Sequence, residues 1–184
     1  TDNLAAPTYF VVGSLPSTYY YISGSPYTAS NWNSLVGGGG AAASSLSGQG
    51  WSYIIPSGRT VTVTGVDLVI GSGSSASQVI VQSGGTVDVP NGIGFVIGGN
   101  GGAFTLQAGG TIRARGGGGI NGISNATGAI QVQAGTPGTV TVTYDPAANY
   151  IFSNPVSGPA QTAAVGVKPA VTIANNVTVD AGRS

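Results

Sequence analysis

The sequence predicts an all-β fold, and more narrowly a parallel β-solenoid with rungs of about 25–26 residues each. Helix-forming residues are scarce, because the 184 residues include no Glu and one Lys, whereas Gly occurs 33 times and Pro 10 times. Val, Ile, Phe and Tyr lie in short runs that alternate with polar residues, as on strands with one buried face. The third observation is a glycine turn that recurs at nearly constant spacing.

Four segments align on this turn. They begin at Tyr53, Val79, Phe104 and Ile130, and their turn glycines are Gly58, Gly84, Gly109 and Gly135. The glycines follow one another at intervals of 26, 25 and 26 residues. Because the interval is long and regular, each segment is expected to lie over the preceding one and to bury its apolar face against that near copy.

Each period has room for three strands. In chain order we expect them at 53–56, 60–64 and 67–70, then 79–82, 86–89 and 94–97, then 104–107, 111–114 and 119–123, and finally 130–133, 139–143 and 149–152. Period-two alternation assigns four inward columns. These are Tyr53, Val79, Phe104, Ile130; Ile55, Val81, Leu106, Val132; Val61, Val87, Ile112, Val140; and Val63, Val89, Ala114, Val142.

Outward positions also align between periods. The spacing predicts an amide ladder of Gln82, Gln107 and Gln133 and a threonine column of Thr60, Thr86, Thr111 and Thr139. Asp88 and Arg113 occupy equivalent outward positions on neighbouring rungs, so we expect an exposed ion pair that helps to set the register.

The flanks are less regular than the repeat. Residues 1–50 form a Tyr-rich N-terminal extension, which supplies either partner-binding or capping strands, and 51–184 form the solenoid domain. The Gly-, Ala- and Ser-rich stretch 37–45 has the composition of a flexible connector. Because alternation does not determine which strands pair, an antiparallel β-sandwich or jelly roll remains the alternative fold.

The residue inventory argues against catalysis. A chain without His, Cys, Glu or Met lacks the usual nucleophile–base pairs and the imidazole or thiolate ligands of metals. Its five carboxylates are all Asp and do not follow the repeat, so they predict no paired acid–base site. Five basic residues are too few for a nucleic-acid surface. We expect a protein that is not an enzyme and has no cofactor, metal site or nucleic-acid partner.

Cellular location is predicted from the same inventory. No apolar run reaches the length of about 18 residues that spans a bilayer, so no membrane span is expected. No basic, signal-like segment begins the chain, and an exported form is expected to have lost its signal. Two glycosylation sequons start at Asn125 and Asn176, which would suit an extracellular or cell-surface protein.

The repeated [S/A]-G-G-T turn, flanked by alternating strands over residues 53–144, resembles the β-helical passenger regions of bacterial autotransporter and haemagglutinin-like surface proteins. The resemblance implies an exported protein that is adhesive or structural and has few catalytic groups on its rungs.

The functional hypothesis is an extracellular, non-enzymatic structural protein that assembles with copies of itself into a filament, sheath or surface layer. A stack of rungs ends in unpaired strand edges that need a cap or a partner. The N-terminal residues suited to adding a strand to a neighbour are Tyr9, Phe10, Val11, Val12, Tyr19, Tyr20, Tyr21 and Ile22. The alternative is an adhesin or glycan-binding module for surface glycans, with Trp32, Trp51, Tyr19, Tyr20 and Tyr21 as stacking platforms.

Overall fold

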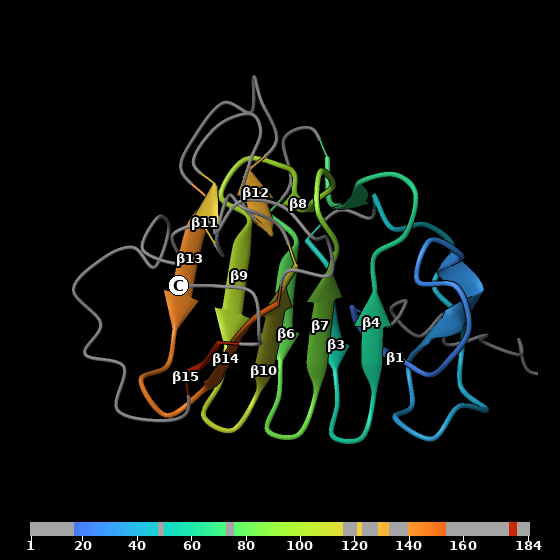
Figure 1. Ribbon diagram of the computed structural model, residues 1–184. Coiled ribbons are helices and arrows are strands. Elements are labelled where there is room, and N and C mark those ends of the chain that lie inside the picture. The colour runs from blue at the N-terminus through green and yellow to red at the C-terminus, as the bar shows by residue number, and fades with distance from the viewer. Residues whose placement is uncertain are drawn as a thin grey trace, which may run out of the picture.

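The computed structural model describes residues 17–47, 50–72, 76–115, 121–122, 129–132, 140–153 and 177–179. Within these ranges the regular structure is β-strand, apart from the 3₁₀ turn η1 (Ala29–Asn31). The strands form three sheets, and between residues 52 and 132 the chain visits sheet A, sheet B and sheet C in that order before it starts again (Figure 1). We call each passage through the three sheets a rung. The predicted all-β class is confirmed.

Sheet A contains six strands. In spatial order they are β13 (Thr141–Tyr144), β9 (Ala103–Leu106), β6 (Gln78–Val81), β3 (Ser52–Ile55), β1 (Thr18–Tyr21) and β2 (Trp32–Asn33). Sheet B contains β15 (Val177–Val179), β14 (Asn149–Phe152), β10 (Thr111–Ala114), β7 (Thr86–Val89) and β4 (Thr60–Thr62). Sheet C contains β11 (Asn121–Gly122), β12 (Ile130–Val132), β8 (Phe95–Ile97) and β5 (Leu68–Ile70).

The first three rungs have the predicted register. Tyr53 pairs with Val79 and Val79 with Phe104, while Ile55 pairs with Val81 and Val81 with Leu106. In sheet B, Val61, Val87 and Ile112 align in the same way, and all of these side chains are 0% exposed. Among the described strands, only β1 and β2 pair antiparallel, which makes sheet A a mixed sheet, and the other pairs are parallel.

The predicted fourth rung is wrong in phase. Ile130 does not lie over Phe104 but pairs with Phe95 in sheet C, so β12 is the third strand of the third rung. Val142 of β13 takes the place over Phe104, and Tyr150 of β14 the place over Ile112. β11, near the expected strand 119–123, pairs with β12 on the side away from β8. The third rung is longer than the first two, and a fixed period of about 25 residues therefore assigned the next strands to the wrong sheets.

The turn between sheets A and B explains the glycine repeat. Gly58, Gly84 and Gly109 have φ angles of +73°, +74° and +72°, a region that glycine enters without strain. Their N–H groups form a line of hydrogen bonds along the stack, from Gly58 to the Gly84 carbonyl, from Gly84 to that of Gly109 and from Gly109 to that of Ala147, each 2.9 Å long. Ala147 thus holds the fourth turn position, and the predicted Gly135 lies outside the described residues.

The N-terminal region continues sheet A. β1 pairs in parallel with β3, which aligns Tyr19 with Tyr53, and its other edge pairs with β2. The stretch predicted as a flexible connector adds a further layer, because the Ala43 N–H donates to the Trp32 carbonyl at 2.8 Å. The described part of the extension thus lies against the first rung, and we call it the cap; its two expected roles, partner binding and capping, stay predictions.

Candidate functional site

The residues expected to bind another copy divide into two groups. Tyr19 and Tyr21 face the interior and are 3% and 4% exposed, whereas Tyr20 and Ile22 are half-buried. Both backbone edges of their strand, β1, are paired within the chain. The other four, Tyr9, Phe10, Val11 and Val12, lie outside the described residues, as do the sequon residues Asn125 and Asn176.

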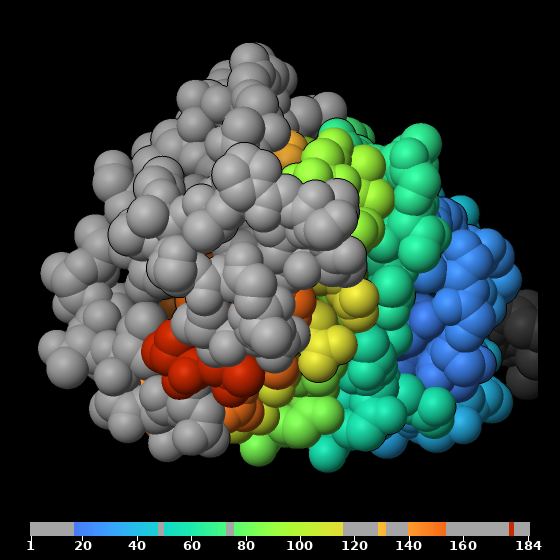
Figure 2. Space-filling view, viewed as in Figure 1, coloured from blue at the N-terminus to red at the C-terminus, as the bar shows by residue number. Residues whose placement is uncertain are grey.

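An aromatic cluster fills the capped N-terminal end, which forms the blue end of the molecule in Figure 2. The Trp32 ring is fully buried and packs against Tyr21 and Tyr53, with ring centroids 5.2 and 5.5 Å away. Trp51 is half-buried against Tyr19 at 5.1 Å. The stacking platforms expected for glycans are therefore core residues in the cases of Trp32, Tyr19 and Tyr21.

Hydrogen bonds satisfy the polar atoms of this cluster. The Trp32 indole N–H donates to the Pro26 carbonyl at 3.0 Å, and the Tyr53 hydroxyl donates to the Ser45 carbonyl at 2.7 Å. The Tyr27 hydroxyl accepts the Thr64 N–H at 2.9 Å, which ties the cap to the segment after β4. Buried aromatic rings with satisfied polar atoms make this end a stable closure of the stack.

The far end of the described stack is built differently. Phe104, Tyr144 and Tyr150 follow one another edge to face, with centroids 6.2 and 6.3 Å apart. The Tyr150 hydroxyl donates to the Asp145 carbonyl at 2.9 Å, but the buried Tyr144 hydroxyl has no hydrogen-bond partner in the described part of the chain. Beyond them, Val177 of β15 is 48% exposed.

Three tyrosine hydroxyls in the two ends have raised pKa values. Burial raises the pKa of Tyr144 far above its usual range, and the neighbouring Tyr150 adds to the effect. Burial also raises the pKa of Tyr150, with a smaller contribution from Asp145. For Tyr21, burial raises the pKa and the charge of Arg59 opposes the rise.

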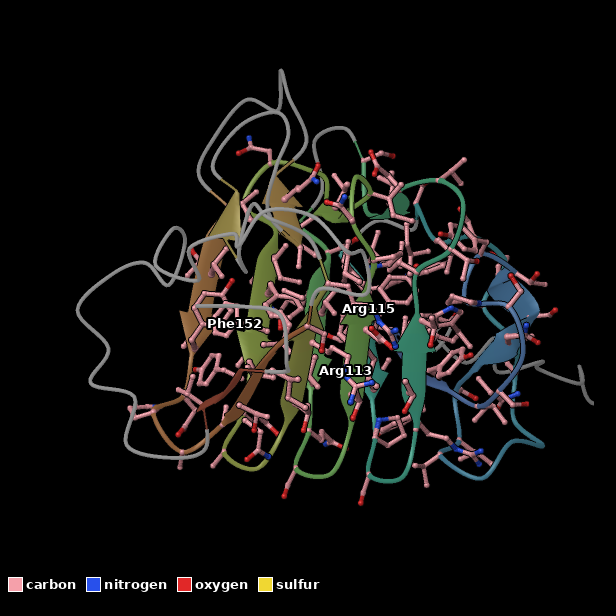
Figure 3. The ribbon with its side chains drawn as sticks, in the orientation of Figure 1. Arg113, Arg115 and Phe152 are labelled. Atoms are coloured by element: carbon pink, nitrogen blue, oxygen red, sulfur yellow. The ribbon has the colours of Figure 1, made fainter. Side chains whose placement is uncertain are left out.

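The charged cluster lies on the outer face of sheet B. Asp88 of β7 is the register partner of Arg113 of β10 and forms an ion pair with it, as predicted, but the Asp88 side of the pair is buried rather than exposed. The Asp88 side chain is only 8% exposed, and its hydrogen-bonded partner is Arg115, whose Nε–H donates to Oδ1 at 2.6 Å while Nη2 donates to Oδ2. Arg113 Nη1 is 4.0 Å from Oδ2. Figure 3 labels the two arginines, Arg113 and Arg115, which lie near each other.

Sequence reasoning missed Arg115 as the partner of Asp88. It compared only residues directly opposite each other, whereas a long side chain two positions further along the next strand also reaches across. Arg113 and Arg115 point to the same side of β10 by period-two alternation, so the diagonal contact was available in the sequence.

The predicted outward ladders are present in part. Thr60, Thr86 and Thr111 align in register, and Asn149 takes the next position, with its side-chain amide 3.4 Å from the Thr111 hydroxyl. Gln82 and Gln107 directly follow the register partners Val81 and Leu106, and Gln133 and Thr139 lie outside the described residues.

The described residues lack two further features, a cluster of metal ligands and a membrane-spanning helix. They contain no group of three or more His, Cys, Asp or Glu side chains that could hold a metal ion. No helix in the same ranges is both long and apolar enough to cross a membrane.

Comparison with known proteins gives no family for this chain. No protein-family model matches the sequence, no curated protein matches it, and no solved structure is similar to it.

Proposed function

We propose that this chain is a parallel β-solenoid that serves as a non-enzymatic structural protein outside the cell and assembles with copies of itself. The stacked register of the first three rungs supports the solenoid. The near absence of charge, with five basic and five acidic residues, leaves a surface on which little electrostatic repulsion opposes close packing of copies. The proposed location rests on the resemblance to bacterial surface proteins.

Val177 carries the proposal of a contact at the C-terminal end. It pairs with Tyr150, whose side chain faces the interior and is 1% exposed. Register partners on parallel strands point to the same side, so Val177 also occupies an inward position, yet it is 48% exposed. An inward apolar side chain that reaches the surface would be covered if a second copy added its strands to this end.

The two ends differ in what they can pair with. In sheet A, the N-terminal edge strand β2 is short and paired within the chain, which protects that sheet from edge-to-edge association, whereas β4 and β5 are the N-terminal edge strands of sheets B and C. Two copies that meet through their C-terminal ends form a closed pair with two-fold symmetry. Growth into a filament or layer needs a second contact, for which Tyr9, Phe10, Val11 and Val12 remain the sequence-based candidates.

Analytical ultracentrifugation over a range of concentrations tests the first contact. We expect the wild type to associate and Val177→Lys to remain monomeric where the wild type is largely paired, because a charge would be buried in the contact. Val66→Lys is the matched control, since Val66 is 64% exposed and lies outside the strands. A wild type that stays monomeric at every concentration, or a Val177→Lys variant that associates normally, would refute the proposal.

Negative-stain microscopy tests the second contact. A chain lacking residues 1–16 retains every strand that the structure describes. We expect this truncation to form pairs while the full chain forms longer assemblies. If the full chain and the truncated chain form assemblies of equal length, Tyr9 to Val12 do not supply the second contact.

A further inference from the structure

The outer face of sheet B carries more positive than negative charge. Arg113 of β10 and Arg115, one residue beyond the end of that strand, both lie next to the single carboxylate of Asp88, so the three side chains sum to one positive charge. In the described strands, the outward register neighbours on either side are the neutral residues Thr62 and Ile151. In a chain with five basic residues, two at one place form a marked local surplus.

Arg115 alone satisfies the carboxylate. Its Nε and Nη2 donate to the two different oxygens of Asp88, which is the two-pronged geometry in which a guanidinium binds a carboxylate most strongly. Both oxygens of the buried Asp88 side chain accept hydrogen bonds from Arg115, whereas Arg113 approaches only to 4.0 Å. Arg113 thus carries the positive charge that exceeds the single negative charge of Asp88.

Arg113 has unused donors at the surface. Its Nη1 is 4.0 Å from the nearest Asp88 oxygen, which is beyond hydrogen-bond length, and its Nε is buried with no hydrogen-bond partner in the described residues. A buried donor without a partner is costly, and a guanidinium has five donors to satisfy. The side chain is nevertheless 39% exposed, so a molecule from solution can reach it.

We propose that Arg113 binds an oxyanion, a carboxylate or sulfate group, on the outer face of sheet B. Such a group matches the planar fork of Arg113 and neutralises the surplus charge of the cluster. The hydroxyl of Thr111, two residues earlier on the same side of β10, supplies a polar flank, and the half-buried Ile151 lies on the neighbouring strand. The yellow segment that contains β10 reaches the surface in Figure 2.

The same group can come from a free anion or from an acidic saccharide. Titration calorimetry at constant ionic strength separates the two sources, with sodium sulfate, a sulfated oligosaccharide and a neutral oligosaccharide of equal length as probes. We expect saturable binding of at least one sulfated probe and none of the neutral one. Tighter binding of the sulfated oligosaccharide than of sulfate identifies the saccharide as the source, and equal affinity identifies the free anion.

Three variants make the test specific. Arg113→Gln removes the charge but leaves the Arg115 pair with Asp88 in place, and we expect a loss of affinity of about tenfold or more. Arg113→Lys keeps the charge without the fork and should lose less, which also provides a folded variant if the glutamine does not fold. Arg59→Gln is the control, because Arg59 lies in the turn after β3, and its affinity should match the wild type.

Two results would overturn the proposal. One is the absence of saturable binding of every anionic probe. The other is equal affinity in the wild type, Arg113→Gln and Arg113→Lys. Neither result bears on self-assembly, which is measured separately.

Discussion

The two ends of the stack close their cores in different ways. At the N-terminal end, Trp32 and Tyr53 are 0% exposed and their polar atoms are hydrogen-bonded to backbone carbonyls of the cap. At the C-terminal end of the described residues, the Tyr144 hydroxyl is buried without a partner and Val177 is 48% exposed. Between the ends, each rung is completed by a similar rung. The comparison indicates that repetition builds the middle, whereas each end needs residues outside the repeat.

The largest expected loss of stability comes from a substitution in the core of the N-terminal end. Trp32→Ala removes the largest fully buried side chain and should lower the free energy of unfolding by about 3–5 kcal/mol. Leu35→Ala, in the same capping segment but 57% exposed, should change it by less than about 0.5 kcal/mol. Denaturant unfolding measures both. Similar losses in the two variants would show that Trp32 does not close the core.

Two tyrosine substitutions, one at each end, should change the free energy of unfolding in opposite directions. Tyr53→Phe removes a hydroxyl that donates to the Ser45 carbonyl and should cost about 1 kcal/mol. Tyr144→Phe removes an unsatisfied buried hydroxyl and should stabilise the protein by about 1 kcal/mol. Tyr150→Phe, which loses a bond to Asp145, is the control within the C-terminal end and should destabilise. Destabilisation by Tyr144→Phe would contradict the described difference between the ends.

The last expected effect on stability appears only at alkaline pH. Tyrosine ionises near pH 10 in an unfolded chain, whereas burial raises the folded-state pKa of Tyr144, Tyr150 and Tyr21. The unfolded state therefore loses protons first, so this contribution is fully present below about pH 10 and is lost as pH rises. Each fully protected tyrosine contributes a slope of about 1.4 kcal/mol per pH unit.

Tyr144→Phe should make the loss of stability above pH 10 shallower, because it removes one buried hydroxyl whose folded-state pKa is raised. Thermal unfolding between pH 8 and pH 11 checks the slopes. Identical slopes in the wild type and Tyr144→Phe would show that Tyr144 ionises freely in the folded protein.

The first three rungs were predictable because their apolar residues alternate along each strand and their glycine turns recur at a nearly constant interval. Alternation identified the buried residues Val81 and Leu106, and the turns at Gly84 and Gly109 fixed their register. The prediction failed where the third rung lengthened, because glycine-containing residues 133–135 resemble the repeated turn, whereas the observed fourth turn at Ala147 has no glycine.

The ends and the charged cluster were less predictable for other reasons. Trp32 and Tyr19 belong to no repeat, so the sequence suggested partner binding or capping for them without deciding between the two. In the structure both side chains are buried in the hydrophobic core. Arg115 was missed as the partner of Asp88 because the contact is diagonal. Aligning equivalent positions compares only residues directly opposite each other and does not show how far a long side chain extends.

Engineered disulfides test the stacking order most directly, because the chain has no cysteine of its own. Thr105 pairs with Thr143 in the structure, whereas a strict repeat would place Gln131 over Thr105. Neighbouring strands are about 4.8 Å apart, within the range that a disulfide bridges. We predict that Thr105→Cys with Thr143→Cys forms an intramolecular disulfide on mild oxidation, and that Thr105→Cys with Gln131→Cys does not. The reverse result would contradict the assignment of β13 to the fourth rung.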